Sequence, residues 1–177
     1  MKKLILEKCK RVKIVLTDVD GVLTDGGMYY TEKGDIMKKF HTRDGMGVTL
    51  MKKYGIPTII ITKEKTPMVK QWSRRMKIEK LYDGIIQKEK ILEKICERYE
   101  VSSDEILYIG DDVNDVELLK KVGLSVCPYD AIESVKKKCN YVCNAKGVEG
   151  CLREIAYIII SFNEKYRNKR TKAKEKL

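Results

Sequence analysis

Residues that anchor soft-metal sites, membrane spans or secreted domains are scarce in this chain. Among its 177 residues there is one histidine, His41, and no stretch approaches the roughly 18 to 20 apolar residues that a membrane-spanning helix needs. The first six residues are too few and too charged for the apolar segment of a signal peptide. We therefore expect a cytoplasmic protein with no membrane partner.

Cysteine is present, but not in a pattern typical of metal binding. Of the six cysteines, the grouping that most resembles a metal site is Cys139, Cys143 and Cys151. A structural zinc site usually has close-spaced pairs of ligands, which this grouping lacks, and the single histidine lies far away in the sequence. We therefore predict free thiols, as in a reducing compartment.

The chain carries 37 lysines and arginines against 26 aspartates and glutamates, a formal net charge of +11. Most of the basic residues are scattered among glutamates, as on solvated helix faces. Only the end of the chain is a concentrated basic run, and we interpret residues 165–177 as a basic C-terminal tail. A nucleic-acid-binding protein stays an alternative, which steeply salt-dependent binding would support. Because the basic residues lack a recognition motif, we expect no nucleic-acid partner.

Short apolar runs alternate with amphipathic segments along the chain. The apolar runs predict strands at 12–17, 56–62, 105–110, 122–126 and 141–143. The segments between them predict helices at 46–53, 66–76, 88–98, 116–121, 131–137 and 147–162. This order predicts an α/β fold with a parallel central sheet and helices on both faces. The length suits a single domain, which we place at residues 1–164.

A β-hairpin is predicted at about residues 26–40. Two β-prone stretches there surround Glu32-Lys-Gly-Asp35, a sequence typical of a tight turn. An isolated two-stranded ribbon is only marginally stable in water. We therefore expect the hairpin to overhang a site beside it or to pair with another subunit.

Two carboxylates, Asp18 and Asp20, end the first predicted strand and are followed by glycine. Alternate residues of an extended chain point the same way, so both side chains enter one crevice. Like charges are tolerated at such a distance where a cation or a proton is expected. Ligands of parallel sheets bind at the carboxyl ends of the strands. The polar residues gathered at that edge are Asp18, Asp20, Thr62, Lys88, Asp111, Asp112 and Asp115.

Several carboxylates with one hydroxyl and one ammonium indicate a site for magnesium and phosphate. Mg²⁺ prefers a few carboxylate oxygens together with water and substrate phosphate. A carboxylate that attacks a phosphate dianion is opposed by about 4 kcal/mol per unit-charge pair at ~4 Å and an effective dielectric of ~20. Mg²⁺ and Lys88 would offset this repulsion.

Four motifs resemble those of the haloacid dehalogenase superfamily: Asp18-Val-Asp-Gly-Val-Leu-Thr-Asp-Gly26, Thr62 after an apolar strand, Lys88, and Gly110-Asp-Asp-Val-Asn-Asp115. The hairpin, Phe40-His-Thr-Arg-Asp-Gly45 and Lys146-Gly-Val-Glu-Gly-Cys-Leu-Arg-Glu154 are similar to its capless branch, which dephosphorylates 2-keto-3-deoxy sugar acids. The resemblance implies a Rossmann-like three-layer fold with a hairpin flap and no cap domain. It also implies a homotetramer, in which the hairpin and tail of one subunit close a neighbour's site.

The resemblance also implies a role for each site residue. Asp18 would be the nucleophile that becomes an aspartyl phosphate, and Asp20 would be the acid and base. Asp20 favours phosphoester hydrolysis, because related ATPases and dehalogenases lack it. The remaining roles are phosphate binding by Thr62, Lys63 and Lys88, metal binding by Asp18, the backbone carbonyl of Asp20 and Asp111, positioning of Lys88 or a metal-bound water by Asp115, and support by Asp112 and Asn114.

The substrate has two candidates by the same resemblance: 3-deoxy-D-manno-octulosonate 8-phosphate, and a nine-carbon 9-phosphate such as that of 2-keto-3-deoxynononate or N-acylneuraminate. Glu64 favours nine carbons, and Arg75 matches one basic position of the nine-carbon enzymes. Trp72 stands at their other basic position. Lys63 replaces a glycine beside the phosphate loop, where close backbone approach suits glycine. A phosphatase of low specificity is the alternative.

The segment after the hairpin leaves one residue with two interpretations. Arg43 either contacts the substrate carboxylate or pairs with Asp44 at a helix start, because arginine suits both uses. We interpret His41 as a residue at the edge of the hairpin, since no other motif residue requires it.

A receiver-like signalling module is another function class with an acidic cluster, a threonine and a lysine on a parallel sheet. Its acidic pair lies on the first strand and its phosphorylated aspartate on a later one. The order of the motifs in this chain does not match that pattern.

Overall fold

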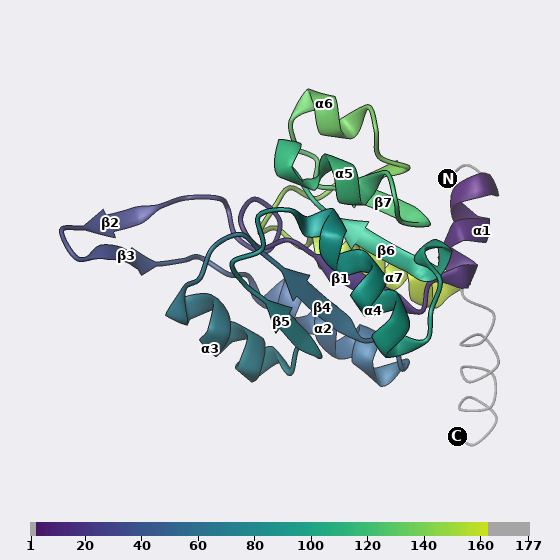
Figure 1. Cartoon of the computed structure of the whole chain (residues 1–177). Coiled ribbons are helices and arrows are strands. Elements are labelled where there is room, and N and C mark those ends of the chain that lie inside the picture. Colours follow the sequence, from purple (N-terminus) through teal and green to yellow (C-terminus); the bar gives the residue numbers. More distant parts are fainter. Residues whose placement is uncertain (1–2, 163–177) are drawn as a thin grey trace, which may run out of the picture.

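The computed structural model describes residues 3–162, and a six-stranded sheet lies at its centre (Figure 1). The strand order is β5-β4-β1-β6-β7-β8, and every neighbouring pair is parallel. The predicted parallel α/β fold is therefore confirmed. The strands are β1 Ile14–Thr17, β4 Thr58–Ile61, β5 Lys80–Tyr82, β6 Ile106–Ile109, β7 Leu124–Cys127 and β8 Tyr141–Val142. The short edge strand β5 is not among the predicted strands.

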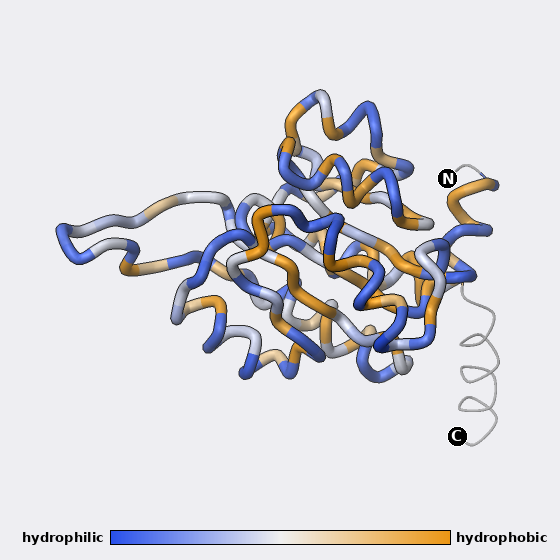
Figure 2. Tube along the Cα trace, in the orientation of Figure 1, coloured by the Kyte–Doolittle hydropathy of each residue, from blue (hydrophilic) through white to orange (hydrophobic). Residues whose placement is uncertain are grey.

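Two apolar layers cover the sheet because neighbouring residues of a strand face opposite sides. In β1, Val15 belongs to the buried cluster on one face of the sheet, and Ile14 and Leu16 belong to the buried cluster on the other face. Figure 2 shows the hydrophobic residues concentrated along the central strands. The helices are α1 Lys3–Arg11, α2 Thr42–Lys53, α3 Pro67–Met76, α4 Leu92–Tyr99, α5 Val116–Leu119, α6 Glu133–Lys136 and α7 Cys151–Phe162, with 3₁₀ turns η1 Lys88–Ile91, η2 Ser103–Glu105 and η3 Val113–Asp115.

Helix α2 begins at Thr42, four residues before the predicted start. His41 is its N-cap, and the imidazole Nδ1 accepts a hydrogen bond from the backbone N–H of Arg43 at 3.0 Å. Two glycines weaken the helical pattern but allow close packing: a Cβ at Gly47 would lie 3.0 Å from the Cα of Arg153 in α7, and a Cβ at Gly45 would lie 2.5 Å from the Sδ of Met76 in α3. His41 is therefore a helix cap, which corrects its interpretation as a hairpin-edge residue.

Asp44 joins α2 to α7. Its side chain is fully buried, and its Oδ1 accepts a hydrogen bond from the backbone N–H of Leu152 at 3.0 Å. Burial raises the pKa of Asp44 to about 6, although hydrogen bonds from the first turn of α7 act to lower it. Of the two interpretations of Arg43, pairing with Asp44 is thus not the one that the structure shows.

Other helix boundaries also differ from the prediction. The segment predicted as one helix at 88–98 is the turn η1 followed by α4, and α7 begins at Cys151 rather than at residue 147. Helix α1 was not predicted. Thr66 caps α3 with Pro67 at its first turn, as expected.

The predicted hairpin is formed by β2 Tyr29–Thr31 and β3 Gly34–Met37, which pair antiparallel and project away from the sheet (Figure 1). Its base is closed by a bridge between Thr24 and Phe40, and the Phe40 ring stacks on Trp72 at 4.9 Å between centroids. Apart from this hairpin, residues 3–162 form no second sheet, as expected of a fold without a cap domain.

The chain ends lie outside the part that the structure describes. The predicted basic tail, 165–177, and the domain boundary at residue 164 fall there. Within residues 3–162, no helix is both long and apolar enough to cross a membrane.

Candidate active site

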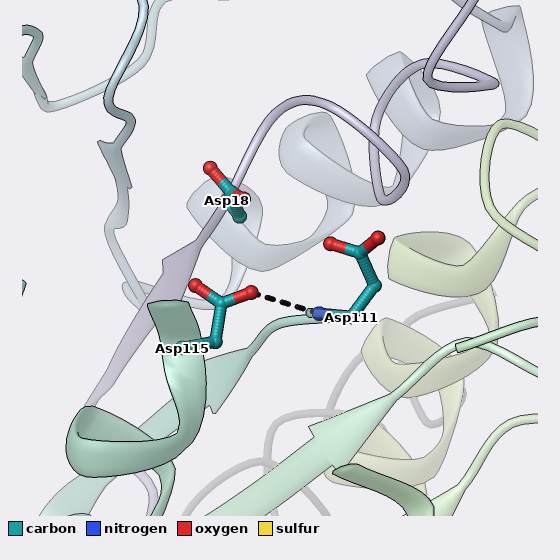
Figure 3. Close-up of side chains that lie close together, drawn as sticks. All are labelled: Asp18, Asp111 and Asp115. Atoms are coloured by element: carbon teal, nitrogen blue, oxygen red, sulfur yellow. Dashed lines mark hydrogen bonds between the residues drawn. The ribbon is translucent and has the colours of Figure 1, made fainter. Parts of the chain in front are cut away.

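Asp18 lies directly after β1, at the carboxyl edge of the sheet (Figure 3). Its backbone N–H donates to the carbonyl of Ile109 in β6 at 2.9 Å, and the residue is only 6% exposed. The Nζ of Lys88 lies 2.8 Å from its Oδ2. Burial raises the pKa of Asp18 to about 7, against the lowering effect of the Lys88 ammonium.

Lys88 is fully buried between two carboxylates. Besides Asp18 it contacts Oδ1 of Asp115, at 2.6 Å. Burial alone would lower the pKa of Lys88, but the charges of Asp18 and Asp115 outweigh it and raise that pKa. A buried ammonium is stable only when it is paired in this way. Lys88 therefore remains a fixed cation beside Asp18, and Asp115 holds it in place.

Asp115 is the centre of the loop that follows β6. Its Oδ2 accepts a hydrogen bond from the backbone N–H of Asp111 at 2.9 Å (Figure 3) and another from the backbone N–H of Asp112 at 3.2 Å. Its Oδ1 also accepts a hydrogen bond from the buried hydroxyl of Tyr108. Gly110 leaves room for this arrangement, since a Cβ there would lie 2.5 Å from the Cβ of Asp115. Sequence reasoning missed Tyr108, which reads as one more apolar residue of β6.

Three carboxylates converge at this edge: oxygens of Asp18, Asp111 and Asp115 lie within 4.8 Å of one another. Asp111 Oδ1 is buried and receives no hydrogen bond from the described residues. Burial, together with the charges of Asp18 and Asp115, raises the pKa of Asp111 to about 8. Gly21 makes the close approach possible, since a Cβ there would lie 2.0 Å from Asp111 Oδ2. An oxygen set with one unsatisfied buried member suits a hard cation such as Mg²⁺, the predicted cofactor.

The carboxylate of Asp20 turns away from this cluster. Its Oδ1 accepts hydrogen bonds from the hydroxyl of Thr24 at 3.0 Å and from the ammonium of Lys38 at 2.7 Å. Lys38 follows β3, and its side chain is only 4% exposed. Burial acts to lower the pKa of Lys38, but the hydrogen bond and charge of Asp20 raise it overall. Sequence reasoning missed Lys38, because no motif distinguishes it from the chain's other lysines.

A cavity of about 570 Å³ opens above these groups. The predicted site residues that line it are Asp18, Asp20, Thr62, Lys63, Glu64, Asp111, Asp112 and Asn114, and the hairpin adds Met28, Tyr30 and Lys38. Lys88, Tyr108 and Asp115 do not line the cavity and are fully buried, and we call these three residues the floor of the site. Thr62 is buried, and its hydroxyl accepts a hydrogen bond from the N–H of Glu64 at 3.4 Å. Eight of the eighteen lining residues are therefore predicted site residues.

Two predicted specificity residues are not among the cavity's lining residues. Arg75 borders a separate cavity of about 340 Å³ with Phe40 and Trp72. Arg43 is exposed and lies against Gly150, where a Cβ would be 3.3 Å from its side chain. Within one subunit, neither guanidinium belongs to the site.

Known proteins are similar to this chain in sequence. A family model of haloacid dehalogenase-like hydrolases matches residues 58–155. The chain is 30% identical over 154 residues to the 3-deoxy-D-manno-octulosonate 8-phosphate phosphatase of Haemophilus influenzae, covering 87% of this chain and 86% of that protein. It is 31% identical over 156 residues to the enzyme of the same name from Escherichia coli K12, covering 88% and 83%.

Solved structures agree. The crystal structure of 3-deoxy-D-manno-octulosonate 8-phosphate phosphatase from Yersinia pestis superposes on this chain with a TM-score of 0.90 at 28% identity, covering 94% of this chain and 90% of that one. The Moraxella catarrhalis enzyme, in complex with a magnesium ion, a phosphate ion and KDO, gives a TM-score of 0.90 at 26% identity, covering 97% and 99%. Because the family model matches more than half of the chain and relatives of at least 30% identity cover most of it, the chain belongs to the haloacid dehalogenase-like hydrolases.

Proposed function

We propose that this protein is a Mg²⁺-dependent phosphatase that hydrolyses the phosphomonoester of a 2-keto-3-deoxy sugar acid through an aspartyl-phosphate intermediate. The observation that carries the proposal is the buried Lys88, fixed between Asp18 and Asp115 below the acidic cluster. A fixed cation beside a carboxylate offsets the repulsion between that carboxylate and a phosphate dianion. The names of the similar proteins support the same reaction.

The residues act in two steps. Asp18 forms a bond to phosphorus while the bond to the bridging oxygen breaks, and Asp20 gives that oxygen its proton. Asp20 then takes a proton from water, whose oxygen bonds to phosphorus as the bond between phosphorus and the Asp18 carboxylate oxygen breaks. Lys88, Thr62 and Lys63 hold phosphoryl oxygens, and Asp112 and Asn114 support the loop at the cavity rim.

A divalent cation would be held by Asp18 and Asp111, with the backbone carbonyl of Asp20 as the further ligand that the resemblance implies. Its positive charge would stabilise the negative charge that develops on the phosphoryl oxygens.

For the substrate, 3-deoxy-D-manno-octulosonate 8-phosphate is supported by the names of the similar proteins. A nine-carbon 9-phosphate is the second candidate, because Glu64 lies on the cavity wall. The Arg75 argument for nine carbons would require a second subunit to complete the site, since Arg75 borders a different cavity.

The test is phosphate release from a panel of eight-carbon and nine-carbon sugar-acid phosphates, with and without EDTA. We expect EDTA to abolish turnover, added Mg²⁺ to restore it, and Asp18→Asn to lower kcat by at least about a thousandfold. Asp104→Asn, an exposed site paired with Arg11, is the matched control. Full activity in EDTA or in Asp18→Asn would refute the mechanism, and the highest kcat/KM on the panel decides the chain length.

We further propose that the protein is a cytoplasmic homotetramer in which hairpins contact neighbouring subunits. The hairpin carries exposed apolar side chains, among them Met28, Tyr30, Ile36 and Met37, and all six cysteines are free. Exposed apolar clusters of this kind mark association surfaces. Light scattering after size exclusion should give four times the subunit mass, and a monomer mass would contradict the proposal.

A further inference from the structure

The two carboxylate oxygens of Asp20 have different surroundings. Oδ1 accepts two hydrogen bonds, from the Thr24 hydroxyl at 3.0 Å and from the Lys38 ammonium at 2.7 Å. Within residues 3–162, no hydrogen bond is made to Oδ2. Because Asp20 lines the cavity, the oxygen that remains available to a bound molecule is Oδ2.

Lys38 is held where it can keep this arrangement. Its side chain is only 4% exposed although it follows an exposed strand, and Asp35 lies on its other side at 3.7 Å. The neighbouring Lys39 serves as a contrast, since its side chain is 59% exposed and it faces Asp25 at 3.7 Å. A buried ammonium between two carboxylates has few alternative positions, so it restrains the carboxylate that it contacts.

We propose that Lys38 is a positioning residue that fixes Oδ1 of Asp20, so that proton transfer to the leaving oxygen takes place through Oδ2. The inference rests on the proposed function, because it assigns the acid role to Asp20. In the first step the proton on Oδ2 moves to the bridging oxygen as the phosphorus–oxygen bond breaks. The carboxylate that remains is stabilised at Oδ1 by the ammonium of Lys38 and the hydroxyl of Thr24. In the second step the same Oδ2 takes a proton from the attacking water.

The arrangement also ties the hairpin to the chemistry. Lys38 directly follows β3, whereas Asp20 and Thr24 belong to the loop after β1. Displacement of the hairpin would therefore remove one of the two donors to Oδ1. The acid is fully oriented only when the hairpin lies over the site.

Leaving groups distinguish this role from a purely structural one. An alkoxide needs a proton as it leaves, whereas a nitrophenolate does not, so an oriented acid matters only for the alkyl ester. The experiment compares Lys38→Met, Lys38→Arg and Lys39→Met on 3-deoxy-D-manno-octulosonate 8-phosphate and on p-nitrophenyl phosphate. The first turnover is followed by rapid mixing, so that the later hydrolysis step does not mask the result.

For Lys38→Met we expect at least about a tenfold loss on the alkyl ester and less than about a threefold loss on the aryl ester. Lys38→Arg should restore most of the alkyl rate, and Lys39→Met should match the wild type on both esters. Equal losses of Lys38→Met on both esters, or no loss on the alkyl ester, would overturn the inference. Wild-type protein that hydrolyses neither ester would overturn the proposed function instead.

Thr24→Val provides a second test if Lys38→Met does not fold, because it removes the other donor to Oδ1 with little change of shape. We expect the same selective loss on the alkyl ester, smaller than that of Lys38→Met. An unselective loss in Thr24→Val would contradict the role assigned to Oδ1.

Discussion

The floor of the site and the hairpin above it are held in opposite ways. In the floor, Lys88, Tyr108 and Asp115 are fully buried, and each side chain is hydrogen-bonded to a residue of another element. In the hairpin, Tyr30 and Ile36 are 61% and 58% exposed, and the two strands pair only with each other. A buried polar network fails when one member is removed, whereas an exposed ribbon tolerates substitution. We therefore expect substitutions in the floor to change the stability of the subunit, and substitutions in the hairpin to change specificity with little effect on stability.

The largest effect is expected in the floor. Lys88→Met should abolish phosphatase activity and lower the free energy of unfolding by about 3 to 5 kcal/mol, since it removes the cation from between two buried carboxylates. Urea unfolding followed by the fluorescence of Trp72, the only tryptophan, measures this change. Lys120→Met is the control. Lys120 pairs with Glu117 at 2.7 Å on the exposed surface, so removing this ion pair should not measurably change the free energy of unfolding. Equal unfolding midpoints for the wild type and Lys88→Met would show that the floor is not a cooperative network.

An intermediate effect is expected at Asp44, which joins α2 to α7. Its folded-state pKa of about 6 lies above the usual value of 3.8, so the folded protein binds the additional proton. The contribution of this carboxyl to stability is therefore greatest below pH 4 and falls as the pH rises to about 6, by at most about 3 kcal/mol.

Asp44→Asn tests this sign. The amide oxygen keeps the hydrogen bond from Leu152 and does not titrate, so the loss of stability between pH 4 and pH 7 should be smaller in the variant than in the wild type. The measurement is urea unfolding at both pH values, and subtracting the two proteins removes the contributions of Asp18 and Asp111. Identical pH dependence in both proteins would mean that Asp44 ionises normally.

The smallest effect on subunit stability is expected in the hairpin. Tyr30→Ser with Ile36→Ser should change the unfolding free energy of the subunit by no more than about 0.5 kcal/mol, because both side chains are exposed. If the hairpin joins subunits, the same variant should reduce the mass measured by light scattering. A large loss of stability that does not depend on protein concentration would show that the hairpin belongs to the core of the subunit.

The pattern of the chain was sufficient for much of the fold. Apolar runs such as 56–62 identify their strands because most of their residues are apolar, as in strands that are buried on both faces. Thr66 and Pro67 identify a helix start by local chemistry alone. The predicted start of α2 was wrong, because Gly45 and Gly47 weaken the helical pattern. The structure gives the reason for both glycines: Gly45 lies against Met76 of α3, and Gly47 lies against α7.

The family, the hydrolase class and the magnesium cofactor also followed from the sequence, and the comparisons confirm them. The individual catalytic roles stay predictions, as do the chain length of the substrate and the tetramer. Arg43 and Arg75 were chosen by position in a motif, and within one subunit neither lines the cavity.

The sequence by itself determined which residues stand at the carboxyl ends of the strands, because an apolar run and the motif that follows it are close together along the chain. Only the tertiary structure decided how those residues pair. Three hydrogen bonds join different elements: Tyr108 donates to Asp115, the backbone N–H of Leu152 donates to Asp44, and Lys38 donates to Asp20. No periodicity encodes such contacts, since they exist only after the sheet, the helices and the hairpin have packed.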